Sequence, residues 1–506
     1  MRTRDSISVL LTTEGTYPFY GGGVSTWCHR LTHGLPEIDF SLMAVVTNPY
    51  PQARYELAPN VREVIKVPQW GLLQPAEYSH HQPTSLVLRN FWDTTEGVIR
   101  SRFKPLFERF LALVLSAECD PEELGRALLE MQNYFQRFDY QRSVNSHDAW
   151  AVVLHSVRAT WEERPPATEQ PTLAEVKQAY RLLYHLLMVL HFPIMKVDIT
   201  HSSAASFCGL PCVLAKLTHG TPYILTEHGV YLREQYLNLR GQMNSFFVRW
   251  FLYRLVESVV RLNYYFADQV SPVCSYNSRW ERHLGVPESR IKVIFNGVDP
   301  EKFHRSSNER RNERPVVSNI GLIYPLKSQL DLIEAATIVR QKFPNVDVRF
   351  YGAANDASYF EACKQRVAEL HLEDNITFVG PTTEPWTVYS ESDVIAFPSI
   401  SEGFPYAILE AMMCGAAVVA TDVGGVSEAL GDCGVLVPSR SPRAMAYALS
   451  CLLNDHCGRE RLGRLAYARA IENFTEEQFL RSYHRTYQTL LARPPEDLRT
   501  RVAVGE

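Results

Sequence analysis

The sequence of 506 residues lacks several features that mark particular classes of protein. No apolar run reaches the roughly 18 residues that are needed to span a bilayer, and the apolar stretch at residues 7–11 is too short for a signal peptide. No block of basic residues stands out, and 51 Lys and Arg against 56 Asp and Glu give a net charge of −5. We therefore expect a cytoplasmic protein that neither spans a membrane nor binds nucleic acid.

Patterns for metals and dinucleotides are missing as well. Ten cysteines are scattered along the chain, and the close pairs Cys208/Cys212 and Cys451/Cys457 have no Cys or His partners that would complete a zinc site. The chain contains no Asp-x-Asp pair and no Gly-x-Gly-x-x-Gly. We expect free thiols and no requirement for a divalent metal.

What is present is a globular composition with an α/β pattern. Apolar residues make up 46% of the chain and charged residues 21%, and the length suggests two or three domains. A buried strand at 6–12, a glycine loop and a helix predict the start of a doubly wound domain. From about 70 to 191 a helical pattern rich in aromatic residues and leucine replaces the strands, which predicts a helical insertion.

The α/β pattern resumes near residue 197 and repeats in a second unit. The charged run 305–313 predicts a linker, and a capped helix start at 474–480 leads into a terminal amphipathic helix. The predicted domains are a first domain at 1–308, a second at 309–473 and a C-terminal helix at 474–506.

Two glutamates eight residues apart, Glu402 and Glu410, are the most informative feature of the chain. Glu402 ends a loop that contains Gly403 and Pro405, and Glu410 falls one or two turns into the next helix, so both carboxylates are predicted to face one cleft. A helical carboxylate can accept both hydroxyls of a ribose, and the loop carboxylate can reach a sugar bound alongside. Such a pair alone usually marks a solvated helix face, but the residues around this one favour a nucleotide-sugar site.

Further residues have the chemistry that a nucleotide-sugar requires. Gly22 and Gly23 precede a helix whose free N–H groups suit a diphosphate. Lys327 lies just past the first strand of the second unit, where its ammonium can neutralise the charge of a leaving phosphate. His228 follows a short strand and can bond a sugar hydroxyl or the attacking oxygen, with a pKa close enough to neutral to share a proton. Each feature has an ordinary alternative: the glycines can form a simple turn, the lysine can be merely exposed, and the histidine can be structural. His201 is predicted only to shape the crevice.

The chain resembles a known family. Residues 402–425 run through a helix, a glycine turn, a short apolar strand and a glycine-rich loop, and they resemble the donor-binding signature of family 4 retaining glycosyltransferases. Residues 14–19, 22–27 and 225–234 resemble the corresponding segments of PelF-type glycosyltransferases of bacterial exopolysaccharide assembly.

The resemblance implies the α/β GT-B fold, in which two Rossmann-like domains face a cleft and the last helix crosses back to the first domain. It implies a retaining glycosyltransferase that moves a hexose from a UDP-sugar, UDP-glucose foremost, to a glycan or other hydroxyl acceptor in exopolysaccharide biosynthesis. The UDP-sugar is then a substrate, no cofactor or metal is required, and a membrane-associated polysaccharide synthase complex is the implied assembly.

The resemblance also assigns roles to residues. His228, Lys327 and Glu402 are expected to be catalytic, and the expected contacts to the nucleotide-sugar are Gly22, Gly23, Lys327, Glu402, Glu410, Gly424 and Gly425. Leu322 stands where relatives usually carry arginine, which removes one expected phosphate contact. No second carboxylate is placed as a nucleophile, so substitution on the same face of the sugar is expected. A nucleotide-sugar epimerase and a non-catalytic nucleotide-sugar-binding subunit of a synthase complex remain the alternatives.

Overall fold

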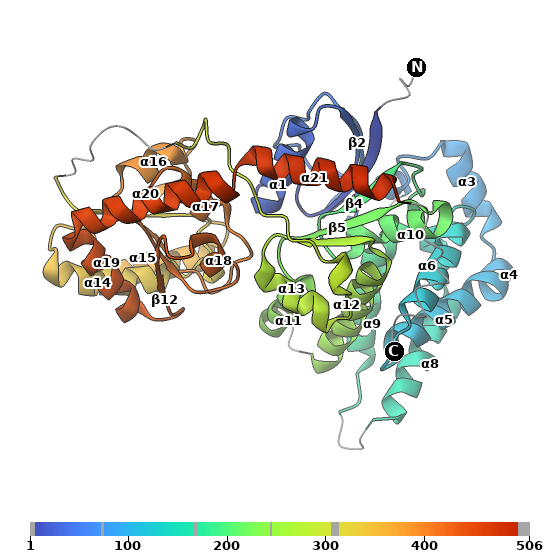
Figure 1. Ribbon diagram of the computed structural model, residues 1–506. Coiled ribbons are helices and arrows are strands. Elements are labelled where there is room, and N and C mark those ends of the chain that lie inside the picture. The colour runs from blue at the N-terminus through green and yellow to red at the C-terminus, as the bar shows by residue number, and fades with distance from the viewer. Residues whose placement is uncertain (1–5, 72–74, 165–168, 243–244, 305–312, 494–506) are drawn as a thin grey trace. The chain divides into compact units, whose positions relative to one another are not determined.

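The chain folds into two α/β units. A computed structural model describes residues 6–71, 75–164, 169–242, 245–304 and 313–493 (Figure 1). Unit 1 comprises Met1–Pro272, Arg279–Lys292 and His484–Glu506, and unit 2 comprises Val273–Ser278 and Val293–Tyr483. The predicted linker at 305–313 lies outside the described residues except for its last position.

Unit 2 begins earlier in the chain than the predicted boundary after residue 308. The side-chain amide of Asn296 donates to the carbonyl of Phe404 at 2.8 Å, and the ring of Phe295 stacks on that of Phe404. Val298 forms a bridge with Thr475. The segment before the charged run therefore belongs to unit 2 because its polar and aromatic groups find their partners there.

Unit 1 is built on a parallel sheet with the strand order β3-β2-β1-β4-β5-β6. Its strands are β1 (Ile7–Glu14), β2 (Ile38–Val46), β3 (Val61–Pro68), β4 (Ile199–Ser202), β5 (Tyr223–Glu227) and β6 (Gln269–Pro272). Strands β4, β5 and β6 are buried along their whole length, as expected for parallel strands covered by helices on both faces. The order reverses between β1 and β4, which opens a crevice at the carboxyl ends of the strands.

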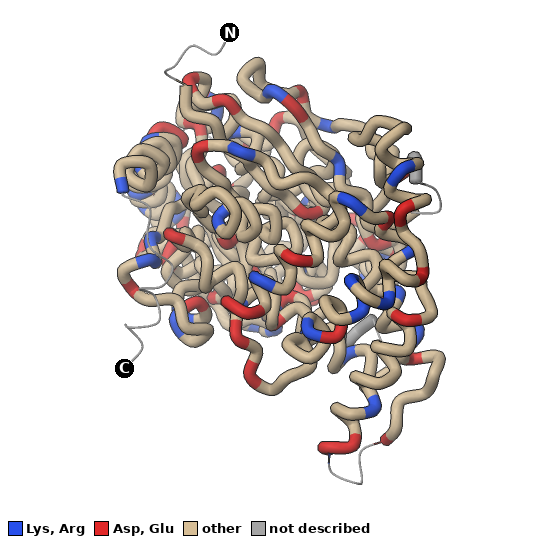
Figure 2. Tube along the Cα trace, turned by 90° about the vertical axis from the view of Figure 1, so that its right-hand side faces the viewer, with Lys and Arg blue, Asp and Glu red and all other residues tan. Residues whose placement is uncertain are grey.

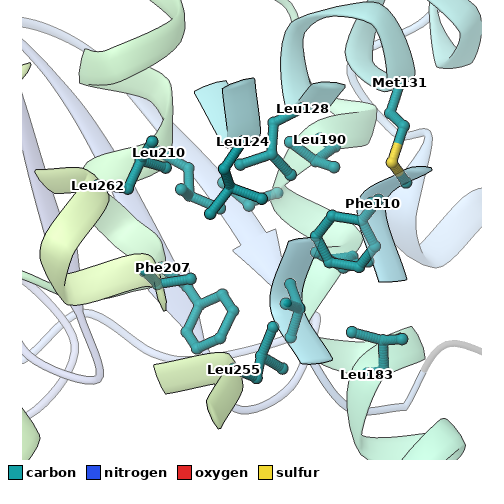
Figure 3. Close-up of a cluster of buried hydrophobic side chains, with 14 of the residues drawn as sticks. Phe110, Leu124, Leu128, Met131, Leu183, Leu190, Phe207, Leu210, Leu255 and Leu262 are labelled. Carbon is teal, nitrogen blue, oxygen red and sulfur yellow. The ribbon is translucent and has the colours of Figure 1, made fainter. Parts of the chain in front are cut away.

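Between β3 and β4 the regular elements of the described residues are all helices. They are α2 (Pro75–Tyr78), α3 (Thr84–Asp93), α4 (Glu96–Val98), η1 (Ile99–Phe103), α5 (Lys104–Leu115), α6 (Pro121–Phe135), α7 (Tyr140–Val144), α8 (His147–Glu162), α9 (Leu173–Leu186) and η2 (Leu187–His191). Figure 3 shows Phe110 of α5 and Leu124 of α6 in one buried cluster with Phe207, Leu210 and Leu255. The helical segment therefore shares a core with the helices that cover the sheet.

The other helices of unit 1 follow the strands. They are α1 (Gly23–Gly34), η3 (Phe207–Gly209), α10 (Leu210–His219), α11 (Tyr231–Gln242), α12 (Phe246–Phe266), α13 (Ser275–His283), whose residues from Arg279 on belong to unit 1, and η4 (Glu288–Arg290). The 21-residue α12 contacts α6, α9 and α10, and so it joins the helical segment to the sheet layer.

Unit 2 repeats the architecture, with the parallel order β12-β11-β10-β7-β8-β9. Its strands are β7 (Val316–Ile320), β8 (Asp347–Tyr351), β9 (Ile376–Gly380), β10 (Val394–Phe397), β11 (Val418–Thr421) and β12 (Val435–Val437). Its helices are η5 (Pro325–Lys327), α14 (Gln329–Lys342), α15 (Ala357–Glu369), α16 (Pro385–Glu391), α17 (Tyr406–Met413), α18 (Val426–Leu430), α19 (Pro442–Asn454), α20 (His456–Asn473) and the first part of α21 (Glu476–Leu491). The prediction of two Rossmann-like domains is confirmed.

Charge and cysteine chemistry agree with the composition. Basic and acidic residues intermingle along the chain in Figure 2. All ten cysteines are free, as expected. Within the described ranges, no helix combines the length and the hydropathy that a membrane crossing requires.

Candidate functional site

In unit 2, the loops that follow β7 and β10 carry the predicted donor residues. These two strands are neighbours at the point where the strand order reverses, which is where ligands of such sheets bind. Lys327 ends η5 after β7, and Glu402 lies in the loop between β10 and α17. The amide of Ile400 donates to the carbonyl of Leu326 at 2.8 Å and joins the two loops.

Lys327 and Glu402 form an ion pair. The Nζ atom of Lys327 lies 2.6 Å from Oε1 and 2.8 Å from Oε2 of Glu402. The hydroxyl of Ser399 donates to Oε1 at 2.6 Å, and the side chains of Lys327 and Glu402 are 32% and 10% exposed. The sequence assigned these two residues to different parts of one ligand, and the structure brings them together. A diphosphate bound at this place would compete with Glu402 for the ammonium group.

Glu410 lies in the second turn of α17, the helix that begins after Pro405. Its Oε2 accepts a hydrogen bond of 3.1 Å from the hydroxyl of Tyr389. Tyr389 is fully buried, and burial together with the Glu410 charge raises the pKa of its hydroxyl well above the ordinary value. The tyrosine therefore stays a donor and fixes one oxygen of the carboxylate. Sequence reasoning did not find Tyr389, because nothing in the motif points to a residue 21 positions earlier.

Gly424 and Gly425 hold the loop that carries Glu402. Gly424 has φ +59°, and a Cβ atom on it would lie 1.8 Å from the carbonyl oxygen of Glu402. The amide of Gly425 donates to the carbonyl of Gly403 at 2.8 Å. The sequence assigned both glycines to donor binding through backbone amides. The Gly425 amide is already bonded within the protein, and both glycines pack against the acidic loop; a contact from the Gly424 amide to the donor stays a prediction.

In unit 1, the carboxyl ends of β1, β2, β4 and β5 surround a pocket of about 460 Å³. Polar side chains in its lining include Glu14, Thr16, Gln69, Ser203, His228 and Glu234. Each comes from the end of a strand or from the segment just after it, except Glu234, which lies in the first turn of α11.

His228 lines this pocket and contacts Trp27. The ring centroids lie 5.0 Å apart in an edge-on arrangement. Burial lowers the pKa of His228 to about 3, so the imidazole is neutral at physiological pH. This corrects the expectation of a pKa near neutral and makes the residue a hydrogen-bonding group. In the described part of the chain, its Nε2 atom is buried without a hydrogen-bond partner. His201, by contrast, bonds Tyr487 at 2.7 Å and Thr226 at 2.8 Å.

Gly22 and Gly23 mark the start of α1. Gly22 has φ +152° and precedes the first helical residue, Gly23, and both are exposed. No atom lies within 4 Å of a Cβ built on Gly22. The backbone of Gly22 is therefore open to a ligand, and a phosphate contact at this helix N-terminus stays a prediction. Neither glycine lines the pocket of unit 1.

Two buried carboxyl groups interact with each other: Glu227, the last residue of β5, and Glu281 of α13. Burial raises the pKa of both carboxyl groups, and the Glu227 charge raises that of Glu281 further. Tyr264 interacts with Glu227. Because two carboxylates cannot both ionise cheaply in one buried space, the pair holds at least one proton near neutral pH.

Comparisons with known protein families agree with the two-unit division. Residues 7–289 match the family described as "Domain of unknown function (DUF3492)". Residues 314–455 match the family described as "Glycosyl transferases group 1". Unit 2 therefore contains a group 1 glycosyl transferase domain.

Curated relatives share part of the sequence. A D-inositol 3-phosphate glycosyltransferase of Paenarthrobacter aurescens is 35% identical over 228 residues, which are 41% of this chain and 55% of that protein. One of Pseudarthrobacter chlorophenolicus is 27% identical over 390 residues, 71% of this chain and 87% of that protein. The chain thus spans about half the length of the first relative.

Solved structures share the fold. Sucrose-phosphate synthase from Thermosynechococcus elongatus has a TM-score of 0.62 at 17% identity, covering 96% of this chain and 99% of that one. Anabaena HepE in complex with UDP-glucose has a TM-score of 0.58 at 15% identity, covering 96% and 100%. With the two parallel sheets, these likenesses confirm the predicted GT-B fold class.

We predict that Gly424→Ala destabilises the acidic loop. An L-residue in the left-handed region costs about 1–2 kcal/mol, and the overlap with the Glu402 carbonyl adds to this because neither backbone can yield freely. Gly220→Ala is the matched control, since Gly220 has φ +69° and nothing within 4 Å of its Cβ position. Urea unfolding should show the larger loss for Gly424→Ala, and equal losses would mean that the loop gives way.

We also predict that the Glu227–Glu281 pair makes stability fall as pH rises. The folded pKa values lie above the unfolded value of 4.5, so the contribution is full below about pH 4.5 and is lost as the pH rises through the neutral range, where the unfolded chain has released its protons. Free energies of unfolding from about pH 5 to 9 should fall in the native protein and fall less in Glu281→Gln. The exposed control Glu108→Gln should keep the native slope. A native slope in Glu281→Gln would contradict the assignment.

Proposed function

The chain belongs to the family described as a domain of unknown function (DUF3492), here joined to a group 1 glycosyl transferase domain, and from this combination we propose that it is a retaining glycosyltransferase. The donor is a UDP-hexose, with UDP-glucose as the first candidate, and the acceptor is a hydroxyl of a glycan or another polyol. The resemblance to PelF-type enzymes supports a role in exopolysaccharide biosynthesis beside a membrane-associated synthase.

The single observation that carries the proposal is the Lys327–Glu402 pair at the point of strand reversal in unit 2. A cation and a carboxylate lie side by side, and Ser399 donates a hydrogen bond to the carboxylate. They match the two ends of a sugar diphosphate, one anionic and one rich in hydroxyls. The proposed binding exchanges partners, because the diphosphate takes the ammonium and the sugar hydroxyls take the carboxylate. Neither group is then left without a partner.

The nucleoside end of the donor is assigned to α17. Glu410 keeps one oxygen on Tyr389, and its carboxylate accepts the ribose hydroxyls. The charge of the leaving UDP is stabilised by Lys327, and we propose that no divalent metal is needed for this step. Leu322 is 39% exposed at the start of the loop that carries Lys327, so the lysine is the cation that the proposal relies on there.

Retention follows from substitution on one face of the sugar. The bond between the anomeric carbon and the β-phosphate oxygen breaks, and the acceptor oxygen bonds to the same carbon on the same face. The proton of the acceptor hydroxyl passes to the leaving phosphate oxygen, which becomes its base. His228 is assigned a hydrogen bond to the acceptor through Nε2, because its low pKa makes it a poor proton store.

We predict that UDP raises the melting temperature of the protein in the presence of a chelator, since binding to the native state alone stabilises it. Glu410→Ala should weaken UDP binding by about 1.5–3 kcal/mol, the range for hydrogen bonds to a charged group. Glu361→Ala, which removes an exposed carboxylate of unit 2, is the control. Thermal shift and calorimetry with UDP measure both effects. Stabilisation that a chelator abolishes would contradict metal-free binding. A separate assay measures transfer of hexose from UDP-glucose to a polyol; transfer is expected of a glycosyltransferase and not of a binding subunit or an epimerase.

We predict that both members of the ion pair support turnover, while removal of the Glu402 charge tightens UDP binding. Lys327→Ala should lower turnover by roughly 3 kcal/mol of transition-state stabilisation, and Leu322→Arg should restore part of it by supplying another cation. Glu402→Gln should also lower turnover but tighten UDP, because it removes the group that competes for the ammonium. Weaker UDP binding in Glu402→Gln would show that Glu402 does not compete with UDP for the Lys327 ammonium.

A further inference from the structure

The pocket of unit 1 has the features of a built ligand site. Its volume of about 460 Å³ lies within the roughly 300–1,000 Å³ that small-molecule sites occupy. Three atoms of its lining residues, Oγ1 of Thr16, Nε2 of Gln69 and Nε2 of His228, are buried with no hydrogen-bond partner in the described structure. Buried polar atoms are nearly always bonded, so three such atoms around one cavity indicate a ligand that is rich in polar groups.

Two carboxylates face the same space. Glu14, at the end of β1, accepts a hydrogen bond from the hydroxyl of Tyr231 at 2.9 Å and one from the amide of Cys208 at 3.3 Å. These bonds fix its position and leave further lone pairs for a ligand. Glu234 lies over the backbone of Gly229, where a Cβ atom would stand 1.9 Å from its Oε1. Only glycine at position 229 lets this carboxylate reach its observed place.

The ionisable side chains of the lining are acidic. Glu14 and Glu234 supply its carboxyl groups, and none of the described residues that line the pocket is a lysine or an arginine. Burial raises the pKa of Glu234, because the charged carboxylate is costly there, and a second negative charge nearby would be costlier still. His228 adds no positive charge because burial keeps it neutral. An anion in this pocket would meet two carboxylates and no cation to offset them. A hydroxyl, by contrast, donates to a carboxylate in a strong, charge-assisted bond.

We propose that this pocket binds an uncharged, polyhydroxylated acceptor, of the kind that a sugar residue or a cyclitol presents, and that Glu14 and Glu234 exclude phosphate esters. This assignment rests on the proposed glycosyltransferase function in one respect: it calls the bound ligand the acceptor. An anion is selected against because Glu14 and Glu234 repel it and no cation of the lining offsets them. A neutral ligand can supply hydrogen bonds to the unpartnered atoms of Thr16, Gln69 and His228. The site therefore differs in charge requirement from one that recognises an inositol phosphate.

The test compares neutral polyols with their own phosphate esters. Binding of myo-inositol, glucose and maltose, and of myo-inositol 3-phosphate and glucose 6-phosphate, is followed by ligand-observed NMR on the full chain, with and without UDP. We expect millimolar binding of at least one neutral polyol, and binding of each ester at least about 10-fold weaker than its parent, since each 1.4 kcal/mol of repulsion is tenfold. UDP binding is measured separately and reports on the proposed donor site alone.

Variants test whether the carboxylates cause the preference for a neutral ligand. Glu234→Gln should weaken the neutral ligand about 10-fold and narrow the gap to the ester, and Glu234→Lys should favour the ester. Gly229→Ala keeps the charge but displaces the carboxylate, whose flexible end can move aside, so it should weaken the neutral ligand with little loss of stability. Glu108→Gln, an exposed carboxylate of unit 1 outside the pocket, should change nothing. Thermal melting checks that each variant is folded.

The outcomes separate the two proposals. An ester that binds as tightly as its parent, or a full panel of neutral polyols that fails to bind at millimolar concentration, overturns the acceptor class. If this happens while UDP still binds through Glu410, the donor assignment stands. If neutral polyols bind and respond to Glu234→Gln but UDP does not bind, the pocket is a polyol site and the proposed transferase function fails.

Discussion

Parallel strand direction is the constraint on which every functional group of this chain depends. In each sheet all strands run the same way, so their carboxyl ends emerge at one edge, and the order reverses once, between β1 and β4 and between β7 and β10. At each reversal the two following loops leave in opposite directions and expose a crevice. Lys327 and Glu402 meet at one reversal, and Glu14 and Ser203 line a pocket at the other. Within each unit the two residues are far apart in sequence, and the topology of the sheet brings them to the same edge.

Glycine makes the close approaches at both edges. Gly424 lets the backbone of one loop lie against the carbonyl of Glu402, and Gly229 lets the carboxylate of Glu234 lie over a strand end. Gly352 does the same for the loop of Lys327, where a Cβ would stand 1.9 Å from the carbonyl of Gly321. In each case a charged side chain or its loop fills the volume of a missing Cβ. These three glycines therefore position two glutamates and a lysine, because they allow close packing around the loops that carry them.

The sequence was sufficient for the periodic and local features. The two Rossmann-like domains, the helical segment after β3 and the position of Glu402 in a loop with Glu410 in the next helix were all predicted. Strands β6 and β12 were not, because β6 is four residues with the polar Gln269 and Ser271 buried inside it, and β12 is three residues long. Neither has a period to detect. The pairing of Lys327 with Glu402, the bond from Tyr389 and the pKa of His228 depend on contacts across loops and on burial, which no local pattern encodes.

The two units differ in the groups that lie beside their carboxylates. In unit 2 the carboxylate of Glu402 has a cation beside it, so the local charge is balanced and an anionic ligand can be admitted by exchange of partners. In unit 1 Glu14 accepts hydrogen bonds from a hydroxyl and a backbone amide, which orient its carboxyl group but place no cation beside it. Under the two proposals, one chain accepts a diphosphate at one sheet edge and rejects phosphate at the other, although its strands follow the same order in both units. The proposed difference in ligand charge therefore depends on the groups that each carboxylate is bonded to. The fold, which the two units share, does not determine it.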